Sequence, residues 1–169
     1  AAPASAKSVL FNGSFEDGVP GNVGGMYFGS TYANMPVSGS SWDIWRSLSG
    51  WTTVSGTGVE VQTKRTLGLT PHSGNYYIEL DSAGNSAIRQ MVDLTRGRYK
   101  FSFAYSPRST NPGTNNIHFA LTDLVSGTAH GPNPGQGTRT GQWTLFSYDL
   151  KVENAGSYAL TLGASGRSD

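Results

Sequence analysis

The sequence predicts an all-β protein, an antiparallel β-sandwich of eight or nine strands. Apolar and polar residues alternate over several segments between residues 74 and 105. This period of two places one side of a strand on a core and the other side in water. The chain also holds 23 glycines, and only 14% of its residues are charged. No window therefore offers the Ala-, Leu-, Glu- and Lys-rich pattern of an amphipathic helix.

The individual strands follow from the same pattern. Three alternating segments are separated by short turns and cover residues 74–81, 87–94 and 98–105. Further strands are expected at 9–11, 51–54, 58–62, 116–122, 143–152 and 157–163. In the segment 143–152 the apolar residues change from odd to even positions near Phe146, which predicts a β-bulge.

Residues 18–50 are predicted to form one long irregular stretch. An irregular segment of that length inside a compact domain is usually functional or disordered. Tyr27, Phe28, Tyr32 and Trp42 argue against disorder, because disordered tracts are poor in aromatic residues. We therefore look for the binding surface in this segment.

The composition excludes several classes of protein. Because the chain has no cysteine, it has no disulfide framework, no thiolate zinc site and no cysteine nucleophile. A formal net charge of +1 gives no reason to expect nucleic acid as a partner. No run of eighteen apolar residues occurs, so insertion into a membrane is not expected either.

The N-terminal residues suggest export. Ala4-Ser5-Ala6 matches the small-x-small pattern at the end of a secretory signal peptide. Residues 1–7 are thus interpreted either as the remnant of a bacterial signal peptide or as a disordered arm. Residues 8–169 are expected to form a single β-sandwich domain of a secreted, extracellular protein.

Six short motifs occur in order between residues 8 and 169. They are Asn12-Gly13-Ser14-Phe15-Glu16, Gly50-Trp51, Val59-Glu60-Val61, Gly74-x-Tyr76-x-Ile78-Glu79-Leu80-Asp81, Gln90, and Arg98-Tyr99-x-Phe101-Ser102-Phe103-x-Tyr105-Ser106-x-Arg108. The set resembles the DUF642-type cell-wall domains of bacteria and plants. These in turn are similar to the family 4/9 and family 22 carbohydrate-binding modules of the galactose-binding-like jelly-roll superfamily.

The resemblance implies a jelly-roll fold, a polysaccharide ligand and a structural calcium ion. Ca²⁺ would be bound by the Glu16 carboxylate, beside Asp17, and by backbone carbonyls, since this ion takes six to eight oxygen ligands. The alternative is that Glu16 is a solvated acid in a turn. The resemblance also implies a closing strand after a segment such as 166–169. We therefore expect a groove in one sheet, filled by a strand-completing segment or a neighbouring chain.

Aromatic residues of the segment 18–50 are the predicted sugar platform. The C–H face of a pyranose packs on aromatic rings, and Trp42 and Trp45, with Tyr27 and Tyr32, could supply such a surface. The alternative is that one of these tryptophans caps the core. The other two tryptophans, Trp51 and Trp143, begin strands and are assigned to the core.

Polar residues are expected to complete the same rim. Arg108 opens a loop, and its guanidinium suits contacts to sugar hydroxyls or uronate carboxylates. The alternative for Arg108 is a structural ion pair with Glu60 or Glu79. Asn116 and His118 are planar hydrogen-bonding side chains on the next predicted strand.

The sequence gives no sign of catalysis. It lacks the Gly-x-Ser-x-Gly, Gly-Lys-Ser/Thr and His-Glu-x-x-His motifs. Glu79 and Asp81 are spaced for one face of a strand, where an exposed acidic surface is expected rather than a pair for glycoside hydrolysis. The sequence thus favours a secreted, non-catalytic carbohydrate-binding module. The alternatives are an adhesin-like domain that assembles by strand completion without binding sugar, and a polysaccharide lyase or glycosidase.

Overall fold

The computed structural model describes residues 7–64, 66–111, 113–131 and 141–167. The predictions for residues 1–6 lie outside this range. The strands are β1 (Trp42–Trp45), β2 (Ser47–Leu48), β3 (Trp51–Ser55), β4 (Val59–Thr63), β5 (Tyr76–Glu79), β6 (Ala87–Leu94), β7 (Gly97–Tyr105), β8 (Ile117–Asp123), β9 (Ala129–His130), β10 (Thr144–Val152) and β11 (Gly156–Ala164). Three short 3₁₀ turns accompany them, η1 (Pro20–Asn22), η2 (Tyr32–Asn34) and η3 (Thr66–Gly68).

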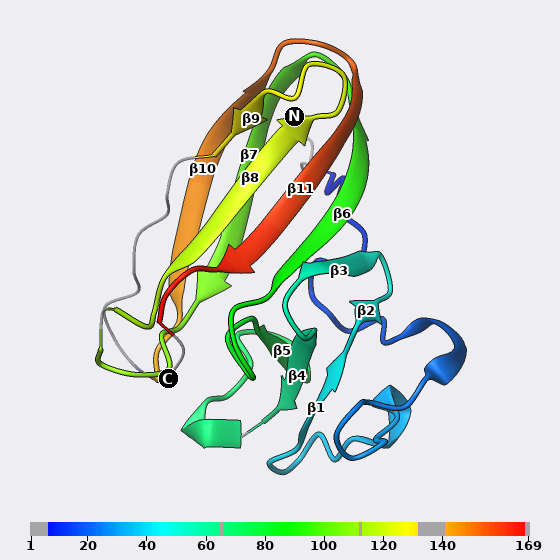
Figure 1. Ribbon diagram of the computed structural model, residues 1–169, viewed down its shortest axis with the longest axis vertical. Helices are drawn as coiled ribbons and strands as arrows, with labels where there is room; N and C mark the ends of the chain where they lie inside the picture. The colour runs from blue at the N-terminus through cyan, green and yellow to red at the C-terminus, as the bar shows by residue number, and fades with distance from the viewer. Residues whose placement is uncertain (1–6, 65, 112, 132–140, 168–169) are drawn as a thin grey trace, which may run out of the picture.

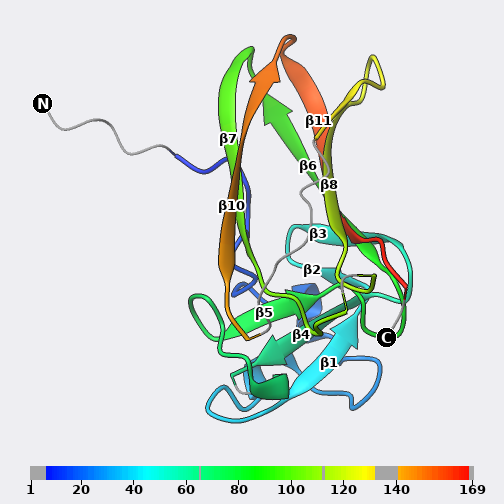
Figure 2. The same ribbon diagram turned by 90° about the vertical axis from the view of Figure 1, so that its left-hand side faces the viewer.

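The strands form two layers, and every pairing is antiparallel. One layer is a six-stranded sheet in the order β2-β3-β6-β11-β8-β9. The other layer consists of two separate pieces, the pair β10-β7 and the three-stranded sheet β1-β4-β5. In Figures 1 and 2, β7 and β10 stand opposite β6, β11 and β8, and β1, β4 and β5 lie at the lower end. This arrangement confirms the predicted antiparallel β-sandwich of jelly-roll type, although the described residues form eleven strands and not the expected eight or nine.

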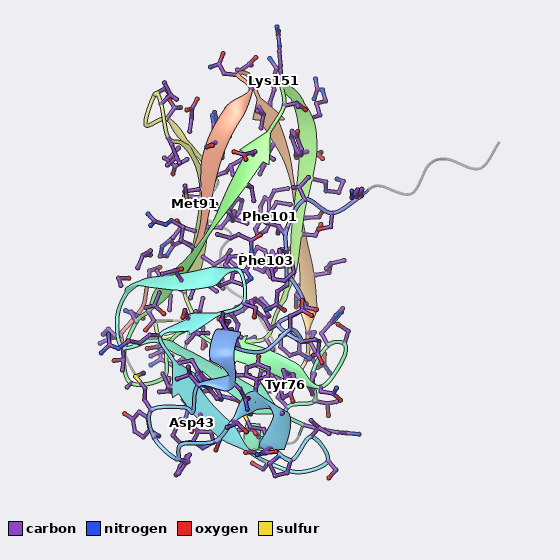
Figure 3. The ribbon with its side chains drawn as sticks, turned by 90° about the vertical axis from the view of Figure 1, so that its right-hand side faces the viewer. Asp43, Tyr76, Met91, Phe101, Phe103 and Lys151 are labelled. Atoms are coloured by element: carbon purple, nitrogen blue, oxygen red, sulfur yellow. The ribbon has the colours of Figure 1, made fainter. Side chains whose placement is uncertain are left out.

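Apolar side chains fill the space between the layers. Phe101 and Phe103 of β7 point inward toward the six-stranded sheet (Figure 3), and the Phe101 ring lies 4.8 Å from that of Phe119 on β8. Leu160 and Leu162 of β11 are buried on the same side. Trp51 is buried as expected, and its indole Nε1 donates a 3.0 Å hydrogen bond to the Asn12 carbonyl.

Several local predictions are wrong. Residues 9–11 form no strand, whereas β1 and β2 lie inside the segment expected to be irregular. The register of β10 with β7 is continuous from Thr144 to Val152, so the expected bulge near Phe146 is absent. A register shift occurs instead in β3, between Thr53 and Ser55. Among the described residues no helix is long and apolar enough to cross a membrane.

Candidate functional site

The most exposed aromatic residues of the segment 18–50 gather on one loop. Tyr27 and Phe28 are 55% and 66% exposed, and both pack on the half-buried Trp42 at the start of β1. The ring centroids of Tyr27 and Phe28 lie 5.6 Å and 4.9 Å from that of Trp42. We call these three side chains the aromatic platform.

A buried carboxylate holds the loop that carries the platform. Asp43 is fully buried, and its Oδ1 accepts hydrogen bonds from the backbone N–H groups of Tyr27 (2.9 Å) and Ile44 (2.8 Å). Its Oδ2 accepts from those of Phe28 and Ser30, both at 3.1 Å. Four N–H donors thus satisfy one buried charge, and the loop is fixed to β1 through them.

Backbone hydrogen bonds and a close approach at Gly25 stabilise the same loop. The N–H of Gly25 donates to the Ser30 carbonyl (2.8 Å), and that of Met26 donates to the Ile44 carbonyl (2.9 Å). A Cβ atom at Gly25 would lie only 2.1 Å from Cγ of Asp43. Glycine is therefore required at position 25 for the backbone to reach the carboxylate.

The platform offers an apolar surface with little charge. The negative charge of Asp43 lies behind the loop and is neutralised by N–H donors. Val23 and Met26, also exposed, belong to the same loop segment. Such a surface suits the C–H face of a neutral sugar ring better than an anionic group.

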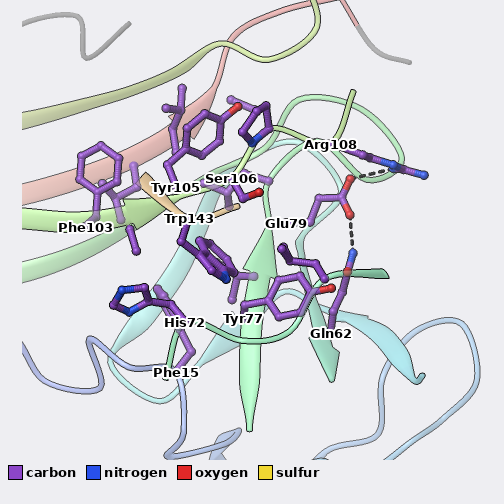
Figure 4. Close-up of a pocket in the computed structure, with 18 of the residues that line it drawn as sticks. Phe15, Gln62, His72, Tyr77, Glu79, Phe103, Tyr105, Ser106, Arg108 and Trp143 are labelled. Carbon is purple, nitrogen blue, oxygen red and sulfur yellow. Dashed lines mark hydrogen bonds and ion pairs between the residues drawn. The ribbon is translucent and has the colours of Figure 1, made fainter. Parts of the chain in front are cut away.

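A groove of about 420 Å³ lies elsewhere, between β5 and β7. Phe103, Tyr105, His72 and Trp143 surround the space shown in Figure 4. Trp143 is only partly buried and therefore does not belong to the core, contrary to the prediction. Its indole Nε1 donates to the Thr70 carbonyl at 2.7 Å, and its ring and that of Tyr77 form a T-shaped pair with a centroid distance of 5.7 Å.

A polar network forms the other side of this groove. Arg108 Nη1 lies 2.7 Å from Glu79 Oε1, and Gln62 Nε2 donates to Glu79 Oε2 (Figure 4). Gln62 Nε2 also donates to Glu60 Oε1. The Ser82 hydroxyl donates to the remaining oxygen of Glu60. Burial, and then the nearby Glu60, raise the pKa of Glu79 to about 7, although Arg108 and Gln62 act in the opposite direction.

These contacts bear on two predictions. Arg108 makes the ion pair with Glu79 that was given as the alternative, and its side chain stays 45% exposed, so a sugar contact of Arg108 stays a prediction. Glu79 is not part of an exposed acidic face, since its side chain is only 14% exposed. The cause of this correction is that the outward side of β4 and β5 is covered, and Glu60 and Gln62 are buried there.

The other predicted rim residues do not form one site. Trp45 (2% exposed) and Tyr32 lie in the core, and they contact each other at a centroid distance of 5.3 Å. Asn116 lines the groove and not the platform. His118, on β8, packs against Gly163 of β11 and is absent from the groove lining. Of the six predicted residues, only Trp42 belongs to the aromatic platform.

Glu16 makes protein contacts of its own. Its carboxylate accepts hydrogen bonds from the backbone N–H groups of Asn75 (2.9 Å) and Tyr76 (3.0 Å) and from the Asn75 side chain. No group of three or more acidic or histidine side chains that could hold a metal occurs within the described ranges. Both oxygens of the Glu16 carboxylate thus accept N–H groups, two on Oε1 and one on Oε2, which a Ca²⁺ ion at this carboxylate would have to displace. Calcium binding at Glu16 and Asp17 stays a prediction.

The sequence analysis missed Asp43, Gly25 and the groove aromatics as parts of a site. The signal for Asp43 was present, because an acid between Trp42 and Ile44 in an apolar run points to a buried carboxylate with local donors. No comparable signal marks the groove, which depends on the gap between two strands.

No family model and no curated protein matches the chain. Solved structures with a similar arrangement include a family 35 carbohydrate-binding module from Clostridium thermocellum, with 11% identity, a TM-score of 0.47, and coverage of 76% of this chain and 89% of that one. TmCBM61 in complex with β-1,4-galactotriose has 16% identity and a TM-score of 0.47, with coverage of 96% of this chain and 90% of that one. An isomalto-dextranase from Arthrobacter globiformis T6 complexed with panose has 12% identity and a TM-score of 0.45, with coverage of 78% of this chain and 21% of the enzyme. Similarity at this level tells nothing about a ligand, so function must be argued from the residues of this chain.

Proposed function

We propose that the protein binds an extracellular polysaccharide without acting on it chemically, and that Tyr27, Phe28 and Trp42 form the binding surface. The observation that carries the proposal is the platform itself: the rings of Tyr27 and Phe28, each more than half exposed, both pack on Trp42, and a buried carboxylate fixes the loop that carries them. A large exposed aromatic cluster on a rigid support is typical of a binding surface.

Rigidity supports the same function. A loop that is already ordered loses little conformational entropy when a ligand binds, so more of the contact energy remains as affinity. The hydrogen bonds to Asp43 fix the backbone of residues 27, 28 and 30, which carry or flank the exposed rings. A sugar ring would therefore meet a preformed surface.

The acidic pair near the groove supports a non-catalytic role. Glu60 and Glu79 share the amide of Gln62, and each also contacts a further side chain, Ser82 or Arg108. Carboxylates that cleave a glycosidic bond must instead face the substrate from opposite sides. The present arrangement favours a structural network.

Affinity electrophoresis through gels containing a neutral glucan, a galactan or a polygalacturonate tests the proposal. We expect a neutral polymer to retard the protein, and Trp42→Ala and Phe28→Ala each to weaken retardation by about 5- to 30-fold, equivalent to about 1–2 kcal/mol for one stacked ring. Phe11→Ala is the matched control, because Phe11 is 58% exposed but lies outside the platform. Unchanged retardation in the platform variants, or an equal loss in the control, would contradict the assignment.

A further inference from the structure

The groove between β5 and β7 has an aromatic end and a charged end. In Figure 4 the rings of Tyr105, Trp143 and His72 surround one part of it, and Glu79 with Arg108 lies at the other. A volume of about 420 Å³ is typical of sites for small organic molecules, which span roughly 300–1,000 Å³. The two ends together restrict the kind of molecule that fits.

The aromatic rings are fixed by their own polar atoms. The indole N–H of Trp143 donates to a loop carbonyl at 2.7 Å, and the hydroxyl groups of Tyr77 and Tyr105 donate to the carbonyls of Thr66 and Asn115, both at 2.8 Å. A ligand at this end therefore meets mainly ring carbons, on side chains that are already held in place. A sugar carries hydroxyl groups around its whole ring, and these would find few partners here. An apolar or aromatic stem suits this end better.

Backbone strain occurs in the same wall. Phe15 lines the groove and has a φ of +62°, a left-handed conformation that bulky residues rarely adopt. Its carbonyl accepts a 2.6 Å hydrogen bond from the Tyr32 hydroxyl, and its ring lies 5.8 Å from that of Trp51. Strain of this kind persists where the surrounding contacts hold it, and it concentrates at ligand-binding sites. The Phe15 ring is thus held at the groove before any ligand binds.

The charged end carries more negative than positive charge. Glu79 and Asp81 line the groove, and Glu60 is joined to Glu79 through the amide of Gln62. Among the described residues that line the groove, Arg108 is the only arginine or lysine. Burial, and then the charge of Glu60, raise the pKa of Glu79 to about 7, as expected for a carboxylate with too little positive charge around it. A further cation at this end would be stabilised.

We propose that the groove binds a small organic cation, an ammonium group on a short aromatic stem, with the stem against Trp143 and Tyr105 and the ammonium beside Glu79. Aromatic rings attract cations as well as apolar stems. The Ser106 hydroxyl lines the groove, is buried, and has no hydrogen-bond partner among the described residues, so it can accept one N–H of the ammonium. An anionic ligand in the same place would be repelled by Glu79 and Asp81. The proposal is independent of sugar binding at the platform.

Isothermal titration calorimetry at about pH 8 tests the class of ligand. Phenethylammonium, phenethyl alcohol and 3-phenylpropionate share a ring and a two-carbon chain and differ in the charge of the end group. We expect the 169-residue chain to bind the cation at least about tenfold more tightly than the alcohol, and the carboxylate more weakly than either. Equal or tighter binding of the alcohol or the carboxylate would overturn the proposal, as would an absence of binding of the cation at millimolar concentration.

The dependence of the affinity on pH identifies the group that receives the ammonium. Glu79 is ionised in the free protein only above about pH 7, whereas an alkylammonium stays charged to about pH 10. The affinity for phenethylammonium should therefore rise by about 10- to 30-fold between about pH 5.5 and 8. A proton on His72 would also repel the cation, and this contribution remains in Glu79→Gln. The rise should shrink to about threefold or less in Glu79→Gln and persist in Glu153→Gln, whose carboxylate pairs with Lys151 at the other end of β10.

Two substitutions of Trp143 test the aromatic end. Trp143→Ala should weaken the binding of phenethylammonium by at least about fivefold, and Trp143→Phe, which keeps an aromatic ring, should recover most of the loss. Urea unfolding checks that both variants fold, and if Trp143→Ala does not, the three ligands and Glu79→Gln decide. The proposal is wrong if Trp143→Phe binds no better than a folded Trp143→Ala, or if Glu79→Gln keeps the affinity and pH dependence of the wild type.

Discussion

Replacing Asp43 by asparagine should release the loop that carries the aromatic platform. The substitution keeps the size of the side chain but turns one of its two oxygens into an N–H₂ donor. Each carboxylate oxygen accepts two backbone N–H groups, from Tyr27 and Ile44 or from Phe28 and Ser30. Whichever way the amide is oriented, two N–H donors will face another donor.

The cost follows from the number of hydrogen bonds. Each bond to a charged group contributes about 1.5–3 kcal/mol, so two such losses amount to about 3–6 kcal/mol if the loop stays in place. The loop can limit this cost by detaching, because its N–H groups then bond to water. We expect the free energy of unfolding to fall by about 3 kcal/mol and polysaccharide retention to be lost. Against a typical total of about 5–15 kcal/mol, the protein should remain folded.

Urea unfolding and amide hydrogen exchange together measure this effect. Exchange at residues 27, 28 and 30 should accelerate in Asp43→Asn far more than exchange in β6 and β11. Val152→Ala is the control, since Val152 is buried on β10 and its truncation should lower stability without changing exchange in the loop. If Asp43→Asn has wild-type stability and wild-type protection at these three amides, the assigned role of the carboxylate is wrong.

Three further outcomes can be checked. Gly25→Ala should weaken retention as Asp43→Asn does, because its Cβ would overlap the carboxylate; affinity electrophoresis measures this. The free energy of unfolding should fall by about 2–3 kcal/mol as pH rises from about 4.5 to 7, because native Glu79 keeps its proton up to about pH 7 and unfolded Glu79 loses it near 4.5. Urea titrations across this pH range measure the change, and the dependence of stability on pH should be flatter for Glu79→Gln. Trp45→Ala should cost about 3–5 kcal/mol in thermal or urea unfolding, because the indole is a core residue; a loss below 1 kcal/mol would refute that placement.

The sequence predicts best the strands that have one buried and one solvent-exposed face. In β6 the burial alternates along Ile88–Leu94, although polar Gln90 is buried and apolar Met91 is exposed, and the strand was expected with its observed bounds. β1 was missed because three of its four residues are buried, so Trp42–Trp45 shows no alternation. All five residues of β4 are buried as well, and Glu60 and Gln62 contact Ser82 and Glu79, which are distant in the sequence.

Trp42 and Trp45 were both assigned to the sugar platform because β1 was not recognised as a strand. Trp42 and Trp45 are three residues apart, and on a strand such residues face opposite sides. Once residues 42–45 are recognised as β1, only one of the two indoles can lie on a given face. Their surroundings make the difference: Trp45 packs on the buried Tyr32, whereas Trp42 is covered by the exposed rings of Tyr27 and Phe28.

The platform and the groove lie on opposite edges of one small sheet. β4 pairs with β1, which begins at Trp42, and with β5, whose other edge borders the groove. In register, Asp43 lies opposite Val61, and Val61 lies opposite Ile78 of β5. A sheet of three strands depends strongly on what packs around it. Packing around β5 therefore supports β4 and, through it, the strand that holds the aromatic loop, so that a surface built by residues 25–43 depends for its rigidity on an edge far from it in the sequence.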